Sequence, residues 1–258
     1  PGGYARARAK EKRGELMSPG AWEITGLRDK RILLAILVPP DLGVSMDFSQ
    51  IIRNLQLPPG SDFMRVAGLP FGPARNQAAR VAVDNGFNLA FLDADIRPVQ
   101  PDAYMILSSL GAPLVSGLYM QRFWPYLPVC FNAGRNEKGE HIRVPITGWK
   151  PGDIFPADFV PAGLLVVQRQ LLVKMFERFS NMPFLWGIDT GPVPEPGGGQ
   201  AYPASEDFTF SFRAANLGYR ALVHSGVVGL HEMRAVVGPR WIIPYPSSDP
   251  LHGVAGVL

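Results

Sequence analysis

Two aspartates close a run of apolar residues in the stretch NLAFLDADIRP, residues 88–98. The apolar run, residues 89–92, has the composition of a buried strand, and Asp93 and Asp95 follow it directly. Two carboxylates this close repel each other and lose hydration, so we expect a compensating cation beside them. Mg²⁺ and Mn²⁺ prefer carboxylate oxygens and commonly add phosphate oxygens from a substrate. The pattern predicts a divalent-metal site, although aspartates also occur in turns for structural reasons alone.

A second acidic pair, Glu206 and Asp207, follows Ser205 at the start of an amphipathic stretch. Acids in the first turn of a helix are stabilised by the helix dipole and by free backbone N–H groups, which is one sufficient reason for them. They also follow a Gly- and Pro-rich segment, residues 181–204, which we expect to form a long surface loop. A carboxylate beside such a loop can act as a general base toward a hydroxyl group, and Asp207 is the candidate.

His231 ends an apolar stretch and precedes Glu232. A histidine in this place is either a hydrogen-bonded core residue or a metal ligand, and imidazole suits Mn²⁺. The single cysteine, Cys130, has no paired histidine motif, so we do not expect a thiol nucleophile.

The elements that position these residues follow an α/β pattern from Arg31 onward, because short apolar runs alternate with amphipathic stretches. In open α/β sheets, ligands gather outside the carboxyl ends of the strands, which is where Asp93 falls. We expect helices over residues 73–86, 169–179 and 205–218, closed at Gly86 and Gly218 in two cases. We expect strands over residues 32–38, 89–92, 112–120 and 163–167, and two short final strands over 219–223 and 226–231.

Composition sets further bounds on the protein. The 258 residues are 47% hydrophobic, which is enough for a large core. One cysteine cannot form an internal disulfide, so a reducing, cytoplasmic setting is expected. No apolar run approaches the roughly 18 residues of a membrane-spanning helix, and the N-terminus lacks the apolar core of a signal peptide.

Positive charge is concentrated at the N-terminus. Residues 1–13 carry a local charge of +4 against +3 for the whole chain, so the remainder is close to neutral. A nearly neutral body without a basic, aromatic-interleaved stripe argues against a nucleic-acid partner. We expect three parts: a flexible basic extension over residues 1–29, a folded domain over 30–234, and a C-terminal tail over 235–258 that packs on or near the site.

Together, the three motifs resemble GT-A glycosyltransferases, especially the family 2-like inverting enzymes. That family shows a strand-end D-x-D, an E-D pair that opens a helix continuing to R-x-x-x-x-G-Y, and a histidine a little beyond. This sequence has FLDADIRP, ASEDFTFSFRAANLGYR and VVGLHEM in that order, over about residues 31–233. The resemblance implies a Rossmann-like GT-A fold in a single domain, with a mixed, mostly parallel sheet flanked by helices. It implies a metal-dependent hexosyltransferase that moves a sugar from a nucleotide-diphosphate sugar to a hydroxyl group.

Residue by residue, the resemblance implies that Asp93 and Asp95 hold Mn²⁺, Mg²⁺ or the donor's ribose, with Asp95 the more direct metal ligand. His231 would complete the metal site. Asp207 would be the catalytic base, with Glu206 beside it to orient the acceptor.

Contacts with the donor, UDP- or GDP-linked, are implied for four further residues. Pro39 and Asp41, in the segment after the first strand, would meet the nucleotide base. Arg75 would contact the nucleotide or its diphosphate, and Gly163 in PAGLLVVQR would lie against the donor sugar or the acceptor. The loop over residues 181–204 would close as a lid that excludes water.

The implied reaction inverts the anomeric carbon if Asp207 lies opposite the leaving group, and a retaining route stays open otherwise. The Q-x-x-R-W motif of processive synthases is absent, so a single transfer to a saccharide or other hydroxyl-bearing acceptor is expected. Two alternatives remain. A sugar-phosphate nucleotidyltransferase needs a Gly-rich basic loop after the first strand, where VPPDLGVSMDF offers only Gly43. A non-catalytic carbohydrate-binding relative would keep the fold without turnover.

Overall fold

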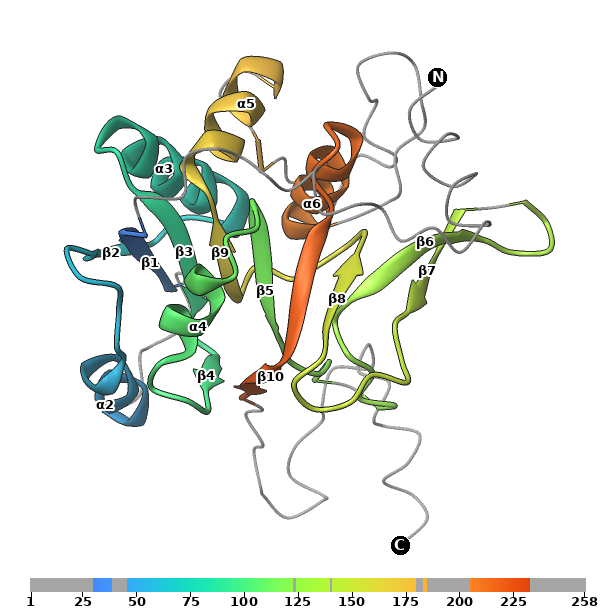
Figure 1. The fold of residues 1–258 in the computed structure, drawn as a ribbon, viewed down its shortest axis with the longest axis horizontal. Coiled ribbons are helices and arrows are strands. Elements are labelled where there is room, and N and C mark those ends of the chain that lie inside the picture. Colours follow the sequence, from blue (N-terminus) through green and yellow to red (C-terminus); the bar gives the residue numbers. More distant parts are fainter. Residues whose placement is uncertain are drawn as a thin grey trace, which may run out of the picture.

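The computed structural model describes residues 30–38, 46–122, 124–139, 141–179, 183–184 and 205–232. Its main element is an eight-stranded mixed sheet (Figure 1). The strands are β1 (Ile32–Val38), β2 (Asp62–Ala67), β3 (Asn88–Asp93), β4 (Ile96–Pro98), β5 (Leu114–Leu118), β8 (Ile154–Ala157), β9 (Leu164–Val167) and β10 (Ala221–His231). Two further strands, β6 (Phe131–Arg135) and β7 (His141–Pro145), form a separate hairpin.

Helices cover both faces of the sheet: α2 (Met46–Asn54), α3 (Phe71–Asp84), α4 (Ala103–Ser109), α5 (Arg169–Phe179) and α6 (Glu206–Asn216). Alternate residues of β1 enter two different cores. Leu33 and Leu37 pack with residues of α3, α5 and α6, whereas Ile32 and Leu34 pack with residues of α2 and α4. A strand buried on both faces needs an unbroken apolar sequence, which explains ILLAILV.

The strand order β2-β1-β3-β9-β5-β10-β4, with β8 paired to β10, decides which motifs meet. β1, β2, β3, β5 and β10 run in one direction, while β9, β8 and β4 run in the other. The carboxyl ends of β3, β5 and β10 therefore share one edge of the sheet. Asp93 lies at the end of β3 and His231 at the end of β10.

Most of the expected elements appear close to their predicted bounds, including β1, α5 and α6. Gly86 and Gly218 follow their helices with φ of +77° and +92°, the left-handed conformation that terminates helices and favours glycine. The prediction of two short final strands is wrong, since residues 221–231 form one strand. A register shift between His224 and Val228 against β5 lets this strand continue through its glycine-containing middle.

Parts of the expected organisation lie outside the described residues: the basic extension over 1–29, nearly all of the loop over 181–204, and the tail over 235–258. Among the helices in the described ranges, none combines the length and the apolar character needed to cross a membrane.

Candidate active site

A buried arginine connects the first two acidic motifs. Arg75 is 2% exposed, and its Nη2 and Nε lie 3.0 Å from Asp93 Oδ2 and 3.0 Å from Glu206 Oε1. The guanidinium also lies over the rings of Phe71 and Phe91, 5.3 and 5.0 Å from their centroids. The side chain is thus enclosed by carboxylates and aromatic rings and holds the end of β3 against the start of α6.

Arg75 differs from its expected role. We expected it to contact the nucleotide or its diphosphate, but on α3 its side chain is buried and paired with two carboxylates. Ala78, Ala79 and Ala82 follow it at helical spacing on the same buried face. The burial of Arg75 and its two ion pairs support a positioning role in the interior.

The surroundings of Arg75 contain more negative than positive charge, because Asp93, Glu206 and Asp207 all act on its guanidinium. Burial raises the pKa of Asp93, and the opposing charge of Arg75 does not fully offset this. Burial and then the charge of Asp207 raise the pKa of Glu206 to about 7, again against Arg75. Asp93 Oδ1 is buried and has no hydrogen-bond partner among the described residues. Such a cluster would be stabilised by further positive charge.

Asp95 faces a different pair of side chains. Its Oδ2 lies 3.1 Å from Arg122 Nη1 and 3.5 Å from His231 Nε2. Burial alone would raise the pKa of Asp95, but the contact with His231 and the charge of Arg122 outweigh it and lower the pKa. Asp95 is therefore held as a carboxylate, which is the form that binds a cation.

The ring orientation of His231 follows from its other nitrogen. His231 Nδ1 lies 3.0 Å from the carbonyl oxygen of Met120. A carbonyl only accepts hydrogen bonds, so Nδ1 carries the proton. Nε2 then faces Asp95 Oδ2 across 3.5 Å, and in a neutral ring its lone pair is available to a cation placed between the two. Metal-ligating histidines usually donate their second nitrogen to such an oxygen.

Backbone pairing brings these distant residues into register. β4 follows the D-x-D directly and pairs antiparallel with the end of β10, with Ile96 opposite His231. The Glu232 N–H donates to the carbonyl oxygen of Asp95 over 2.8 Å. The chain thus fixes His231 beside Asp95 through hydrogen bonds that do not depend on side chains.

These residues fit a divalent cation that is bound partly by substrate. In the described ranges, no three His, Cys, Asp or Glu side chains converge to hold a metal ion. Asp95 and His231 supply an oxygen and a nitrogen 3.5 Å apart, and two neighbouring ligands of an octahedral cation with bonds near 2.1 Å lie about 3 Å apart. Asp93 Oδ2 is engaged by Arg75, so the expected metal contact of Asp93 would fall to its unpartnered Oδ1.

In the second acidic pair, Glu206 lies in the interior and Asp207 lies closer to the surface. Ser205 takes the N-cap position of α6 as expected, but its hydroxyl donates to Asp207 Oδ1 and makes no side-chain capping bond to the backbone. Asp207 is half-buried, and its Oδ1 also accepts from the Phe208 N–H over 2.8 Å. Glu206 is buried against Arg75, so its geometry supports a structural task in place of the expected contact with the acceptor.

Gly163 lies where the residue type matters. A Cβ at this position would come within 2.7 Å of Tyr119 Oη and 3.0 Å of Asp93 Oδ2. The Gly163 N–H donates to Tyr119 Oη over 3.0 Å, and its carbonyl accepts from the Asp93 N–H over 3.1 Å. Gly163 thus lies beside Asp93, and its expected contact with the donor sugar or the acceptor stays a prediction.

Several residues of this region were not singled out from the sequence: Tyr119, Arg122 and Arg143. Arg143 on β7 lies over the ring of Phe208, 5.0 Å from its centroid, and feels the charge of Asp207. Tyr119 and Arg122 follow β5, and Arg143 belongs to β7. No local sequence pattern reveals which strands these two pair with. Pro39 and Asp41, the expected nucleotide contacts, lie outside the described residues.

Comparison with known proteins places the fold. No family model and no curated protein matches the sequence. The structure is similar to the crystal structure of A197 from STIV, with a TM-score of 0.52 and 14% identity over 78% of this chain and 86% of that chain. It is also similar to GalNAc-T7 crystallised with UDP, GalNAc and Mn²⁺, with a TM-score of 0.49 and 13% identity over 91% of this chain and 53% of that chain. Identities this low concern the fold alone, and the expected GT-A-like class, a mixed sheet flanked by helices, is confirmed.

Proposed function

We propose that the protein is a metal-dependent glycosyltransferase that moves a sugar from a nucleotide-diphosphate donor to an acceptor hydroxyl. The observation that carries this proposal is the Asp95 and His231 pair at the carboxyl edge of the sheet. The ring of His231 is oriented by Met120 so that Nε2 faces the carboxylate. Beside it, Asp93 carries a buried oxygen with no partner among the described residues.

In this proposal Asp95 and His231 hold Mn²⁺ or Mg²⁺, and oxygens of the donor diphosphate complete the coordination. When bound, the cation stabilises the negative charge that develops on the departing nucleoside diphosphate. Arg75 keeps Asp93 and Glu206 in place at the ends of β3 and α6. Asp93 and Glu206 then keep their positions when the donor arrives.

Asp207 takes the proton of the acceptor hydroxyl as general base. Its half-buried carboxylate accepts from Ser205 and from the Phe208 N–H through Oδ1, which fixes the carboxyl plane. The hydroxyl attacks the anomeric carbon on the face opposite the leaving group, so the product has inverted configuration. A single transfer is proposed, since the chain lacks the motif of processive synthases.

Metal binding can be tested directly by titrating Mn²⁺ and following the loss of its free-ion paramagnetic resonance signal. Asp95→Asn and His231→Gln should each weaken Mn²⁺ binding by about 10-fold or more, as expected for lost or altered ligands. Asp84→Asn, an exposed aspartate at the end of α3, is the matched control and should bind as the unsubstituted protein does. Equal Mn²⁺ affinity in all four proteins would exclude this metal site.

Donor binding and transfer are then tested separately. A thermal-shift series with UDP- and GDP-sugars, with and without Mn²⁺, should show stabilisation by at least one donor that grows when Mn²⁺ is present. With that donor, Asp207→Asn should abolish transfer and leave donor affinity largely unchanged. If no nucleotide stabilises the protein, the proposal fails; if transfer survives Asp207→Asn, this residue is not the base.

A further inference from the structure

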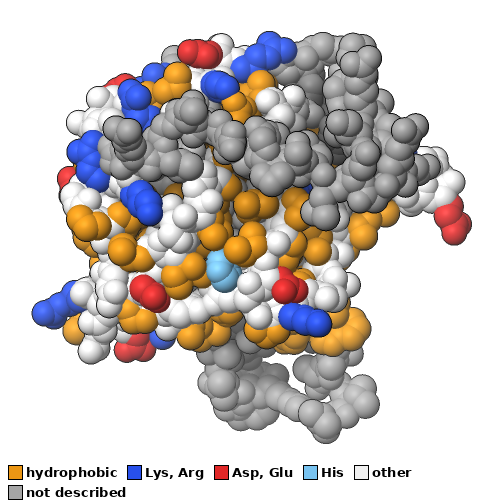
Figure 2. Space-filling model, in the orientation of Figure 1, with side chains coloured by type: hydrophobic (Ala, Val, Ile, Leu, Met, Phe, Trp, Pro, Cys, Tyr) orange, Lys and Arg blue, Asp and Glu red, His pale blue; other side chains and the backbone are white. Residues whose placement is uncertain are grey.

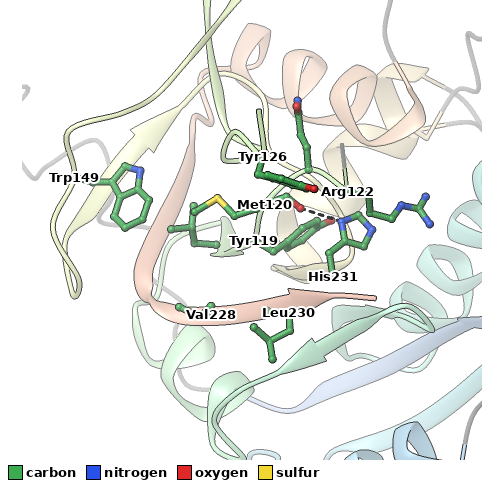
Figure 3. Close-up of a pocket in the computed structure, with 11 residues that line it drawn as sticks. Tyr119, Met120, Arg122, Tyr126, Trp149, Val228, Leu230 and His231 are labelled. Carbon is green, nitrogen blue, oxygen red and sulfur yellow. Dashed lines mark hydrogen bonds between the residues drawn. The ribbon is translucent and has the colours of Figure 1, made fainter. Parts of the chain in front are cut away.

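A pocket of about 330 Å³ adjoins the Asp95 and His231 pair, within the size range of small-molecule sites. Its walls come from the end of β5 and the loop after it, from the end of β10, and from Trp149 (Figure 3). Arg122 and His231 line it, and both of these side chains also face Asp95. The pocket and the proposed metal site are therefore two ends of one space.

The polar side chains of the pocket gather at one end. Arg122 and His231 lie together on the same side in Figure 3, whereas Met120, Trp149 and Val228 extend away from them. Apart from Gln121, the remaining lining residues are glycine, aliphatic, aromatic or thioether in character. A ligand that fills this space therefore meets charged groups at one end only.

The wall that contains Tyr126 is held by the chain's own backbone. In the loop after β5, the Val129 N–H donates to the Tyr119 carbonyl over 3.0 Å, and the Gln121 N–H donates to the Leu127 carbonyl over 2.9 Å. Tyr119 itself is 6% exposed and packs edge-on against the His231 ring, with centroids 5.4 Å apart. The aromatic surface is thus already formed beside the histidine.

Large apolar side chains remain exposed around this space. Leu230 is 58% exposed, Tyr126 44% and Met120 37%. Figure 2 shows hydrophobic side chains over much of the middle of the face in view. Exposed apolar groups that converge on a cavity indicate a ligand site more strongly than single exposed residues do.

Sheet order indicates which substrate the pocket receives. β1 and β2 lie on one side of β3, whereas β5 and β10, which form the pocket, lie beyond β9 on the other side (Figure 1). We expect the nucleotide base beside Pro39 and Asp41, which directly follow β1 in the sequence. The pocket is then left for the acceptor, with Asp95 and His231 between the two substrates.

We propose that this pocket binds the acceptor, and that the acceptor carries its hydroxyl on an aromatic ring. The inference rests on the proposed function for the identity of the second substrate. A saccharide has a hydroxyl group on most ring carbons, and apolar walls leave such groups without partners. An aromatic ring instead gains contact with Tyr126, Trp149 and the Met120 sulfur, and it brings one hydroxyl group where a saccharide brings several.

Binding of 4-methylphenol and of methyl glucoside to the full chain, followed by ligand-observed NMR titration without donor or metal, tests the inference. The phenol should bind more tightly than the glucoside. Leu230→Lys and Tyr126→Ser should each weaken phenol binding by about fivefold or more, since they replace apolar wall by charged or polar groups. Val99→Lys is the matched control, because Val99 is 55% exposed on the adjoining segment and does not line the pocket. It should leave binding unchanged.

Two results would overturn the inference. One is glucoside binding as tight as phenol binding; the other is phenol binding that is absent or survives both pocket substitutions. Either result leaves the proposed transferase function standing if nucleotide sugars and Mn²⁺ still bind. Loss of nucleotide binding with phenol binding intact would instead remove the proposed function and leave an aromatic-ligand pocket.

Discussion

Glu206→Gln is a sharp test of the buried charge cluster, because it removes a charge and keeps the shape. Glu206 is 4% exposed, and its Oε1 accepts from Arg75 Nε over 3.0 Å. The amide oxygen of glutamine can accept the same hydrogen bond. The substitution therefore changes mainly the cost of ionising a carboxyl group inside the protein.

The sign and size of the effect follow from the pKa of Glu206. Burial first, and then the charge of Asp207, raise this pKa from 4.5 to about 7. Between these values the folded protein binds more protons than the unfolded chain, so the free energy of unfolding falls as pH rises. A shift of this size corresponds to about 3 kcal/mol of stability, present below pH 4.5 and lost above about pH 7. Asp93, whose pKa is also raised, adds a loss of the same sign.

Urea unfolding at pH values from 4.5 to 8, with a chelator present, measures this loss. The loss of unfolding free energy with rising pH should be smaller in Glu206→Gln than in the unsubstituted protein by about 3 kcal/mol, so that the variant is the more stable of the two above pH 7. Glu177→Gln, at an exposed position on α5, is the control and should keep the original pH dependence. The reasoning is refuted if Glu206→Gln loses as much stability across this range as the control does.

Three other substitutions test separate parts of the site. Arg75→Met leaves two buried carboxylates without their cation and should lower the free energy of unfolding at pH 7 by about 3–5 kcal/mol in chemical denaturation. The control, Arg80→Met on the same helix, loses a ring contact and should cost about 1 kcal/mol. Similar costs for the two variants would argue against a central role of Arg75 in holding Asp93 and Glu206. Gly163→Ala inserts a methyl group 2.7 Å from Tyr119 Oη and should cost about 1–3 kcal/mol in the same measurement, and a neutral result would mean that the strand end relaxes freely. Arg122→Gln removes a guanidinium 3.1 Å from Asp95 and should tighten Mn²⁺ binding in the absence of nucleotide, measured by paramagnetic resonance; weaker binding would show that Arg122 supports the cation.

The parts of the fold that could be predicted from sequence are those with a strong local signal. β1 is apolar throughout because both of its faces are buried, and α5 has apolar residues at helical spacing, so both agree with their predicted bounds. β2 and β8 lie at exposed places in the sheet and have mixed composition, which gives no comparable pattern. The sequence predicts two strands, 219–223 and 226–231, in place of β10, although in the structure His224 and Ser225 between them lie inside one bulged strand.

The residues of the candidate site likewise divide into those with a local sequence signal and those without one. Asp93 and His231 end strands and Asp95 lies in the turn after Asp93, and a strand end can be found from the apolar run that precedes it. The role of Arg75 could not be found in this way, because an arginine on a helix is normally an exposed residue. Its burial depends on Asp93 and Glu206, 18 and 131 positions away, and therefore on the tertiary fold. The three alanines on its face indicate only that this side of the helix packs against the interior.

The two carboxylates of the D-x-D perform different electrostatic tasks, although the motif presents them as equivalent. Asp93 is turned into the interior, where Arg75 binds one oxygen and burial raises the pKa. Asp95 is turned toward His231 and Arg122, which lower its pKa and keep it ionised at the surface of the cluster. Two adjacent carboxylates that were both exposed to the same cation site would repel each other whenever it was empty. Because Arg75 and Arg122 each bind one of them, the chain can keep both in the folded state, and Asp95, the one held ionised beside a histidine, is the carboxylate best suited to exchange its guanidinium for a metal ion.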